Sequence, residues 1–319
     1  MEEQKHKEIS EQAEPELLYH YTDQQGLDGI LSSGEIWATH YRFFNDSTER
    51  QLGLDAYNNA ILRIAWDHFG SMESAETLAA YLRRCCSDSL PAYIVSFCAS
   101  YAKEEYENAR ENRAPLTEDR RGGDRLSQWR GYGRGSQGYC LAFDFQMLRQ
   151  LPQNFNPFYH SFCIYYRDDS TAGMVEAHVR ELLPQLKGFS ASDLKSLTAL
   201  DNALLQDETR KREILGFVRD MLLLCGILKH SGFQEENEYR LIKLMLPSKM
   251  NPEELHFRST CIPYIKIPLN LTDRDSPLRA VYVGPSPNKD QAVYGLKLRL
   301  KKMGLSADVL LSRIPYRNW

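Results

Sequence analysis

The chain has 319 residues, of which 42% are hydrophobic and 26% are charged, and its formal net charge is −4 at pH 7. This composition predicts a globular protein with a sizeable core, and the small net charge excludes a global electrostatic attraction to nucleic acid. Seven cysteines occur without any C-x-x-C pair, which argues against a structural zinc site and a disulfide framework. We therefore expect reduced thiols and a cytoplasmic protein. No run of about 20 apolar residues is present, so we expect no contact with a membrane.

The beginning of the chain predicts a tail, a strand and a short helix. Residues 1–15 are polar, which predicts a flexible tail ahead of a single domain over residues 16–319. The apolar and aromatic run 17–21 predicts a buried strand. Asp23 then caps a helix that ends at Gly34, and a second short strand follows it.

Two longer helices and a strong strand come next. We expect one helix to run from about Ser47 to Phe69 and another over residues 74–86, followed by an apolar strand over residues 91–98. Residues 103–125 are rich in charges of both signs and contain a proline and a Gly-Gly pair. They predict an exposed insertion, which either acts as a lid or target-contacting loop or has no role.

The second half of the chain alternates between helical and strand patterns. Residues 170–230 are mostly helical in pattern, and we refer to them as the helical block. Further short strands are predicted around the helical block, at residues 138–143, 162–166, 238–246, 264–267, 280–283 and 308–311. Short strands spread along the chain around a block of helices are an α+β pattern.

Two glutamates and an arginine alternate in Glu236-Asn237-Glu238-Tyr239-Arg240. On a strand, residues i and i+2 share a face, so we expect both carboxylates and the guanidinium to point the same way. A carboxylate beside a ribose stabilises the oxocarbenium character that develops when a glycosidic bond breaks. Glu238 is the candidate for that role, and Glu236 is the candidate that orients or deprotonates a nucleophile. The alternative is an edge strand with solvated carboxylates.

Polar side chains also end two of the predicted apolar strands. His20 can hydrogen-bond a ribose hydroxyl, and Thr22 with the strand backbone can hold a carboxamide; a histidine satisfied within the core is the alternative. Ser96 lies near the end of the strand at 91–98. Its hydroxyl either anchors that strand to the glutamate-bearing one or serves only a turn.

A tryptophan and an arginine are adjacent in the predicted helical turn at residues 126–133. A diphosphate needs a cation, and the guanidinium of Arg130 has the geometry to bind one. Trp129 offers a flat aromatic surface that packs either on a ligand ring or within the core.

The ordered set of motifs carries a resemblance. The motifs are Tyr19-His20-Tyr21-Thr22, Asn45-Asp46 with Glu49, Ser127-Gln128-Trp129-Arg130-Gly131-Tyr132-Gly133, and Glu236-x-Glu238-x-Arg240. Together they span about residues 17–317 and resemble a widespread bacterial family known as a domain of unknown function, often encoded near phage-defence loci.

That family is in turn distantly similar to the ADP-ribosyltransferases, including bacterial toxins that modify nucleic acids. The similarity implies an α+β fold with an ADP-ribosyltransferase-like split β-sheet core, into which the helical block is a large insertion. It implies NAD as the substrate, with no metal. It also implies two sets of site residues: the catalytic Glu238 and Glu236, and the NAD-binding His20, Tyr21, Thr22, Ser96, Trp129 and Arg130.

The similarity to toxins implies an effector of toxin–antitoxin or antiviral defence systems that a neutralising antitoxin protein holds in check. From Lys289 to the end the chain has seven Lys and Arg but two Asp, which favours nucleic acid, and RNA over DNA or protein, as the acceptor. Two other functions stay open. One is a non-catalytic nucleotide-sensing module that recruits a partner, and the other is a metal-dependent nuclease that uses Asp46, Glu49, Glu236 and Glu238.

Overall fold

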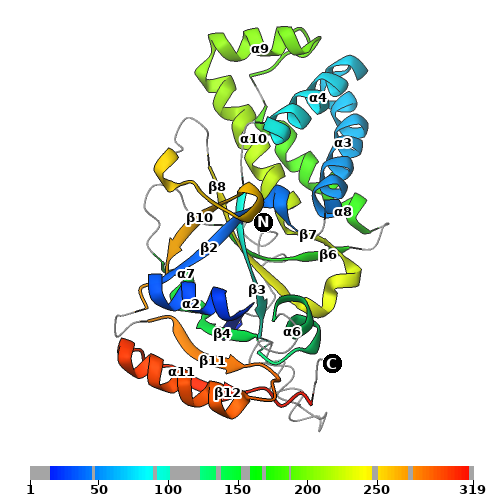
Figure 1. The fold of residues 1–319 in the computed structure, drawn as a ribbon. Coiled ribbons are helices and arrows are strands. Elements are labelled where there is room, and N and C mark those ends of the chain that lie inside the picture. The colour runs from blue at the N-terminus through cyan, green and yellow to red at the C-terminus, as the bar shows by residue number, and fades with distance from the viewer. Residues whose placement is uncertain are drawn as a thin grey trace.

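The computed structural model combines a large mixed β-sheet with a lobe of helices at one end (Figure 1). It describes residues 15–44, 47–88, 92–100, 123–133, 138–151, 159–166, 170–186, 188–245, 251–271 and 276–315. All but the last residue of the predicted tail at residues 1–15, and most of the predicted insertion at residues 103–125, therefore lie outside the described residues.

The first elements form as the sequence predicts. They are β1 (Leu17–Thr22), α2 (Gln24–Ser33) and β2 (Glu35–His40). The side chain of Asp23 accepts a hydrogen bond from the backbone N–H of Gly26, which caps α2 at its N-terminus. Gly34 ends the helix in the left-handed region with φ 66°, a conformation that glycine adopts at little cost.

The helical lobe is assembled from two distant parts of the chain. Apolar faces of helices from both parts share one buried core, which also packs on the ends of two strands through Ile94, Ile242 and Leu244. The helical block at residues 170–230 thus does not pack alone, because residues 47–88 complete it. The helices of the lobe are α3 (Ser47–Phe69), α4 (Met72–Asp88), α8 (Ser170–Leu182), α9 (Leu197–Gln206) and α10 (Glu208–Ile227).

The block is mostly helical, as predicted, but its last residues form a strand. Residues 228–230 form the short strand β7 (Leu228–His230), which pairs in parallel with β6 (Ile164–Tyr166) in a separate two-stranded sheet. Short 3-10 turns connect other elements: η1 (Tyr41–Phe43), η3 (Leu183–Gln185), η4 (Ser231–Glu236), η6 (Pro252–Glu254) and η7 (Ser259–Cys261).

The main sheet has ten strands in the described residues, and most of its pairs are antiparallel. Eight of them follow the order β12-β11-β4-β1-β3-β2-β10-β9, while β8 pairs with both β3 and β5. The strands not yet defined are β3 (Ala92–Ala99), β4 (Tyr139–Asp144), β5 (Tyr159–Phe162), β8 (Glu238–Leu244), β9 (His256–Arg258), β10 (Ile262–Pro268), β11 (Leu278–Val283) and β12 (Asp308–Leu311).

The sheet forks at β3. Along one edge, β3 pairs with β8 over all but its last residue, from Ala92 to Cys98. Along the other edge it pairs with β2 near its start, through Ile94, and with β1 near its end, beginning at Cys98. These two pairings leave residues 95–97 between them, so β1 and β2 diverge from β3 as the two branches of a fork.

The remaining helices flank the lower part of the sheet in Figure 1. They are α6 (Leu126–Tyr132), α7 (Phe145–Arg149) and α11 (Lys289–Met303), and α11 buries Leu296 and Leu300 in the core shared with β11 and β4. No helix within the described ranges is both long and apolar enough to cross a membrane.

The end of the predicted insertion is buried rather than exposed. Asp124 is only 8% exposed, and its carboxylate accepts hydrogen bonds from three donors. Its Oδ1 accepts from the indole Nε1 of Trp129 at 2.7 Å and from the Oγ of Ser312 at 2.6 Å, and its Oδ2 accepts from the backbone N of Arg313 at 2.7 Å. This carboxylate therefore ties α6 to the segment that follows β12.

Candidate functional site

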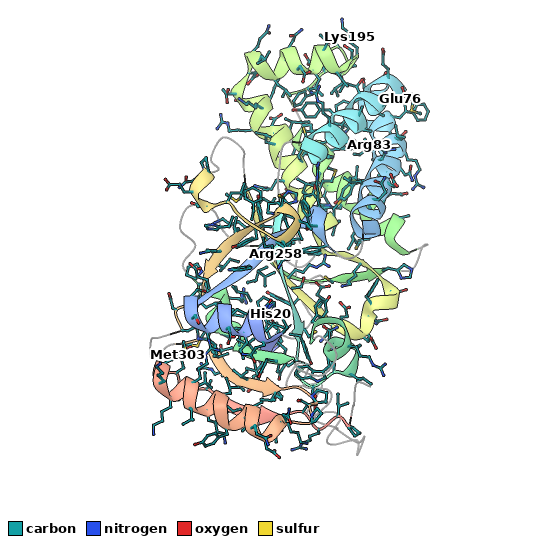
Figure 2. The ribbon with its side chains drawn as sticks, viewed as in Figure 1. His20, Glu76, Arg83, Lys195, Arg258 and Met303 are labelled. Atoms are coloured by element: carbon teal, nitrogen blue, oxygen red, sulfur yellow. The ribbon has the colours of Figure 1, made fainter. Side chains whose placement is uncertain are left out.

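A cleft of about 1100 Å³ opens where the sheet forks. Its lining comes from both branches, β1 and β2, from the middle of β3, which has no strand partner on the side of these branches, and from α2, α6, β7 and β8. His20 and Glu238 are more than 200 residues apart in the chain, yet both line this cleft. Figure 2 shows His20 in the middle of the molecule, well away from Lys195 in the helical lobe and Met303 on α11.

Four charged side chains form an ion network at the base of this cleft. The ammonium of Lys229 donates to Glu236 Oε2 at 2.7 Å and to Glu238 Oε2 at 2.5 Å. Arg240 binds Glu238 through two nitrogens, with Nε 2.7 Å from Oε1 and Nη2 3.1 Å from Oε2. The side chains of Lys229, Glu238 and Arg240 are at most 7% exposed, and that of Glu236 is 16% exposed. We call these four residues the ion network.

The backbone brings the two glutamates together in a way that the sequence pattern does not predict. Glu238 is the first residue of β8, and Arg240 shares its face as predicted. Glu236, however, belongs to η4 and not to the strand, because Asn237 between them adopts a left-handed conformation with φ 43°. The prediction of a shared strand face is therefore wrong for Glu236. It is the ammonium of Lys229 that joins the two carboxylates.

The electrostatics of the ion network keep Glu238 ionised. Burial raises the pKa of this carboxyl, but the adjacent Arg240 and Lys229 outweigh burial and lower the pKa to about 2. For Lys229, burial lowers the pKa of the ammonium, but the carboxylates of Glu238 and Glu236 have the larger effect. The pKa of Lys229 therefore lies above its usual value. Two cations and two carboxylates then face one another, so the ion network has no net charge.

His20 reaches the cleft from β1. Its Nδ1 lies 3.2 Å from the backbone carbonyl oxygen of Ser96, in the part of β3 that the fork leaves without a strand partner on that side. Burial lowers the pKa of His20, so the imidazole is neutral at pH 7. A carbonyl oxygen only accepts hydrogen bonds, so Nδ1 carries the proton and Nε2 is an acceptor.

Three more of the predicted NAD-binding residues, Tyr21, Thr22 and Ser96, also line the cleft. The hydroxyl of Tyr21 accepts from the backbone N of Arg125 at 2.9 Å. Thr22 packs so closely on α2 that a Cβ on Gly26 would lie 1.8 Å from the Thr22 Oγ1. Only glycine fits there without moving Thr22.

The structure does not bring Trp129 or Arg130 to the cleft. Trp129 is 1% exposed and packs edge-on against Tyr21 with ring centroids 4.8 Å apart, so it has no free face for a ligand. Arg130 is exposed and is not among the lining residues. On α6 the side chains that line the cleft are Gln128 and Tyr132, one helical turn apart. The geometry of this cleft therefore does not support the predicted contacts of Trp129 and Arg130 with NAD.

Sequence reasoning missed several lining residues, of which Lys229, Trp37, Thr39 and Arg258 matter most. Lys229 follows a run of apolar residues at the end of the helical block, where a lone lysine gives no signal of its carboxylate partners. Arg258 lies on β9, a strand too short to predict.

The nuclease hypothesis involves four acidic residues. Asp46 and the side chain of Glu49 lie outside the described residues, and Asn45 does too. The carboxylates of Glu236 and Glu238 already have Lys229 as a shared counterion. In the part of the chain that the structure describes, no three His, Cys, Asp or Glu residues lie close enough together to hold a metal ion.

Residues 128–241 match the model of a family described as "Protein of unknown function (DUF2971)". The match covers about a third of the chain and contains the whole ion network as well as most of α6. No curated protein and no solved structure matches the chain at a significant level. The chain is thus similar to a domain-of-unknown-function family in the region that supplies the base of the cleft.

Proposed function

We propose that the protein is an NAD-dependent ADP-ribosyltransferase that acts in the cleft at the fork of the sheet. The observation that carries the proposal is that His20 on β1 and the carboxylates of Glu236 and Glu238 line one cleft large enough for a dinucleotide. A forked sheet with a histidine on its opening strand and a glutamate on a late strand, here Glu238 on β8, is also the arrangement that the resemblance to ADP-ribosyltransferases implies.

In the proposed reaction the bond between the ribose C1′ and the nicotinamide nitrogen breaks, and its electron pair leaves with neutral nicotinamide. Positive charge develops on the ribose, and the carboxylate of Glu238, which is ionised at pH 7, stabilises it. The lone pair of the acceptor then forms a new bond to C1′. The proton of the acceptor passes to Glu236, whose carboxylate is the more exposed of the two.

The neutral imidazole of His20 fits a binding role in this scheme. Its Nδ1 is engaged by the Ser96 carbonyl, so the unprotonated Nε2 is left to accept a hydrogen bond from a ribose hydroxyl. A charged imidazolium would repel the developing ribose cation, and the lowered pKa of His20 avoids that repulsion.

For the acceptor we propose nucleic acid, with RNA favoured. The basic helix α11 lies beside α2, because Arg299 pairs with Asp28 and donates to the Oγ of Ser32. Residues of α2 in turn line the cleft, so the lysines near the end of α11 offer a cationic surface on the helix that packs beside this wall of the cleft. An effector of this activity requires a neutralising antitoxin protein in the cell that makes it.

A second candidate function is a nucleotide-binding module without catalysis. The observation that favours it is the neutrality of the ion network, in which Lys229 and Arg240 offset the charge of Glu238. An offset carboxylate stabilises a ribose cation less than an isolated one does. This candidate predicts NAD binding without release of nicotinamide.

The experiment that tests the proposal is incubation of the full-length protein with NAD labelled in the adenylate phosphate, together with total RNA, DNA or protein of the cell. The proposal predicts label on nucleic acid, most strongly on RNA, and free nicotinamide in equal amount. Label on protein alone would overturn the choice of acceptor, and bound but uncleaved NAD would establish the second candidate instead.

A further inference from the structure

The branch of the fork formed by β2, β10 and β9 presents one polar and aromatic face. On β2 the residues Trp37 and Thr39 share a face, because successive side chains of a strand alternate between faces. Tyr264 of β10 pairs in register with Thr39 on one side and with His256 of β9 on the other. His256 and Arg258 then share that face, and we call these five residues the arm face.

The arm face contains an exposed aromatic surface. The ring of Trp37 is stacked on that of Tyr264, with centroids 4.2 Å apart and planes 24° from parallel. Trp37 is nevertheless 41% exposed, and it lines the cleft. The opposite face of β2 is buried in the core through Ile36 and Ala38, so the position of this tryptophan on the outer face is fixed by the strand. A large exposed ring at a cleft is a stacking surface for a nucleobase.

Arg258 places a cation next to this ring. Its Nη2 donates to Thr39 Oγ1 at 3.1 Å, and within the described ranges this neutral hydroxyl is the partner that its guanidinium has. The other lining cations of the described cleft, Lys229 and Arg240, are instead paired with carboxylates. The Arg258 guanidinium therefore keeps donors for an anionic ligand, and its planar fork suits phosphate oxygens.

The order of groups along the arm face matches a nucleotide. Thr39 lies two residues from Trp37, about 7 Å along the strand, and it holds Arg258 on its other side. Ring, hydroxyl and guanidinium thus follow one another as base, ribose and diphosphate do. Figure 2 shows Arg258 near the centre of the molecule, on the same side of the helical lobe as His20.

We propose that the arm face is a nucleoside-diphosphate subsite, in which Trp37 stacks on the base and Arg258 binds the diphosphate. The assignment rests on the proposed function in one respect: it makes this nucleotide the ADP half of NAD, with the nicotinamide ribose reaching on to His20 and the ion network. It moves the diphosphate contact from Arg130 on α6 to β9.

The test is calorimetric titration of the full-length protein with ADP and AMP. Arg258→Ala should weaken ADP binding about 10- to 100-fold and reduce the preference for ADP over AMP to near one. Trp37→Ala should weaken both ligands by a similar factor, about 5- to 100-fold, and keep the preference for ADP. Both side chains are on the surface, so the melting temperature of each variant should stay close to that of the parent.

Two matched controls remove an arginine and a tryptophan that lie outside the arm face. Arg130→Ala removes an exposed arginine on α6, and Trp66→Ala removes a 52% exposed tryptophan in the helical lobe. Neither should change the affinity for ADP or AMP. An ADP affinity that falls with Arg130→Ala and not with Arg258→Ala overturns the assignment, as does an absence of ADP binding to the parent protein. A third outcome would also overturn the assignment: the parent protein binds RNA in a salt-sensitive way but does not bind ADP, and both arm-face variants abolish the RNA binding. The arm face would then be a surface for single-stranded RNA.

Failure of this subsite and failure of the proposed function give different results. If the parent binds ADP through Arg258 but releases no nicotinamide from NAD, the subsite stands and the transferase activity does not. If the parent cleaves NAD and neither arm-face variant raises the KM for NAD, the activity stands and the subsite assignment is wrong.

Discussion

The ion network gives the sharpest prediction for stability, and Lys229→Met is the change that probes it. Methionine keeps much of the length of the lysine side chain but removes its charge. The variant leaves Glu236 and Glu238 with Arg240 as their remaining cation in the ion network, so a buried negative charge is uncompensated.

The magnitude follows from burial. Removing one partner of a buried ion pair costs about 3–5 kcal/mol, and Lys229 is 7% exposed with two carboxylates at 2.7 and 2.5 Å. Glu236 is the more exposed carboxylate and can rehydrate, which places the loss near the lower end, at about 3 kcal/mol. Adding Glu236→Gln removes the excess negative charge, so the double variant should recover about 1–2 kcal/mol of that loss.

Urea unfolding at pH 7.5 measures these losses, and Lys266→Met is the matched control. Lys266 also pairs with a glutamate, Glu35, at 3.2 Å, but its side chain is 36% exposed. An exposed pair contributes about 0–1 kcal/mol, so this control should lose no more than that. A Lys229→Met variant that loses as little as Lys266→Met would refute the account of a coupled buried network.

Acid should narrow the difference between the parent and Lys229→Met. The pKa of Glu238 is about 2 in the folded protein and 4.5 in its ordinary state. The stability that its ionisation contributes is therefore present above pH 4.5 and is lost as the pH falls toward 2. In the variant one cation is gone and this contribution is smaller, so the parent loses more stability than the variant between pH 5 and pH 3.

Other parts of the site give three more predictions. Asp124→Ala leaves three donors without their acceptor and should lower the free energy of unfolding by about 3 kcal/mol in urea titrations; a loss below 1 kcal/mol would contradict the role of Asp124 in joining α6 to the C-terminal segment. Gly26→Ala should displace Thr22 and weaken NAD binding, whereas Gly29→Ala in the same helix meets no atom within 4 Å and should stabilise the protein by up to about 1 kcal/mol. Equal thermal shifts for the two glycine variants would show that the contact with Thr22 has no consequence. Burial lowers the pKa of His20 below 6.5, so its contribution to stability is present above pH 6.5 and lost as the pH falls through the folded pKa; His20→Asn should flatten the decline in stability between pH 7.5 and pH 5.5, and an unchanged decline would contradict a buried neutral imidazole.

Features set by local chemistry could be predicted from the sequence. Asp23 and Asp144 cap the helices that follow them, and Gly34 ends α2 in the left-handed region, because each depends on its neighbours in the chain alone. Apolar runs of the right length likewise predicted β1 and β3.

Features set by contacts between distant segments could not be predicted. The position of Glu236 depends on the left-handed Asn237, whose side chain donates to the carbonyl of Ala99, 138 residues earlier. Trp129 is drawn into the core by Asp124, which in turn needs Ser312 to be in place. No local pattern in the sequence indicates such distant partners, so the positions of Glu236 and Trp129 could not be predicted.

The cleft at the fork of the sheet could be predicted in part. The family resemblance predicts His20 and Glu238 at one site, and the structure brings both to one cleft. Two other residues that line this cleft, Lys229 and Arg258, come from strands of three residues each. Strands this short have too few residues to establish a periodic pattern.

The most direct measurement of the central proposal is the rate at which nicotinamide is released from NAD in the presence of RNA. The parent protein should release it, and Glu238→Gln should reduce the rate about 100- to 1000-fold. Glu76→Gln, which changes an exposed glutamate on α4 in the helical lobe (Figure 2), should leave the rate unchanged. Full activity in a folded Glu238→Gln protein, or no release of nicotinamide by the parent, would contradict the proposal.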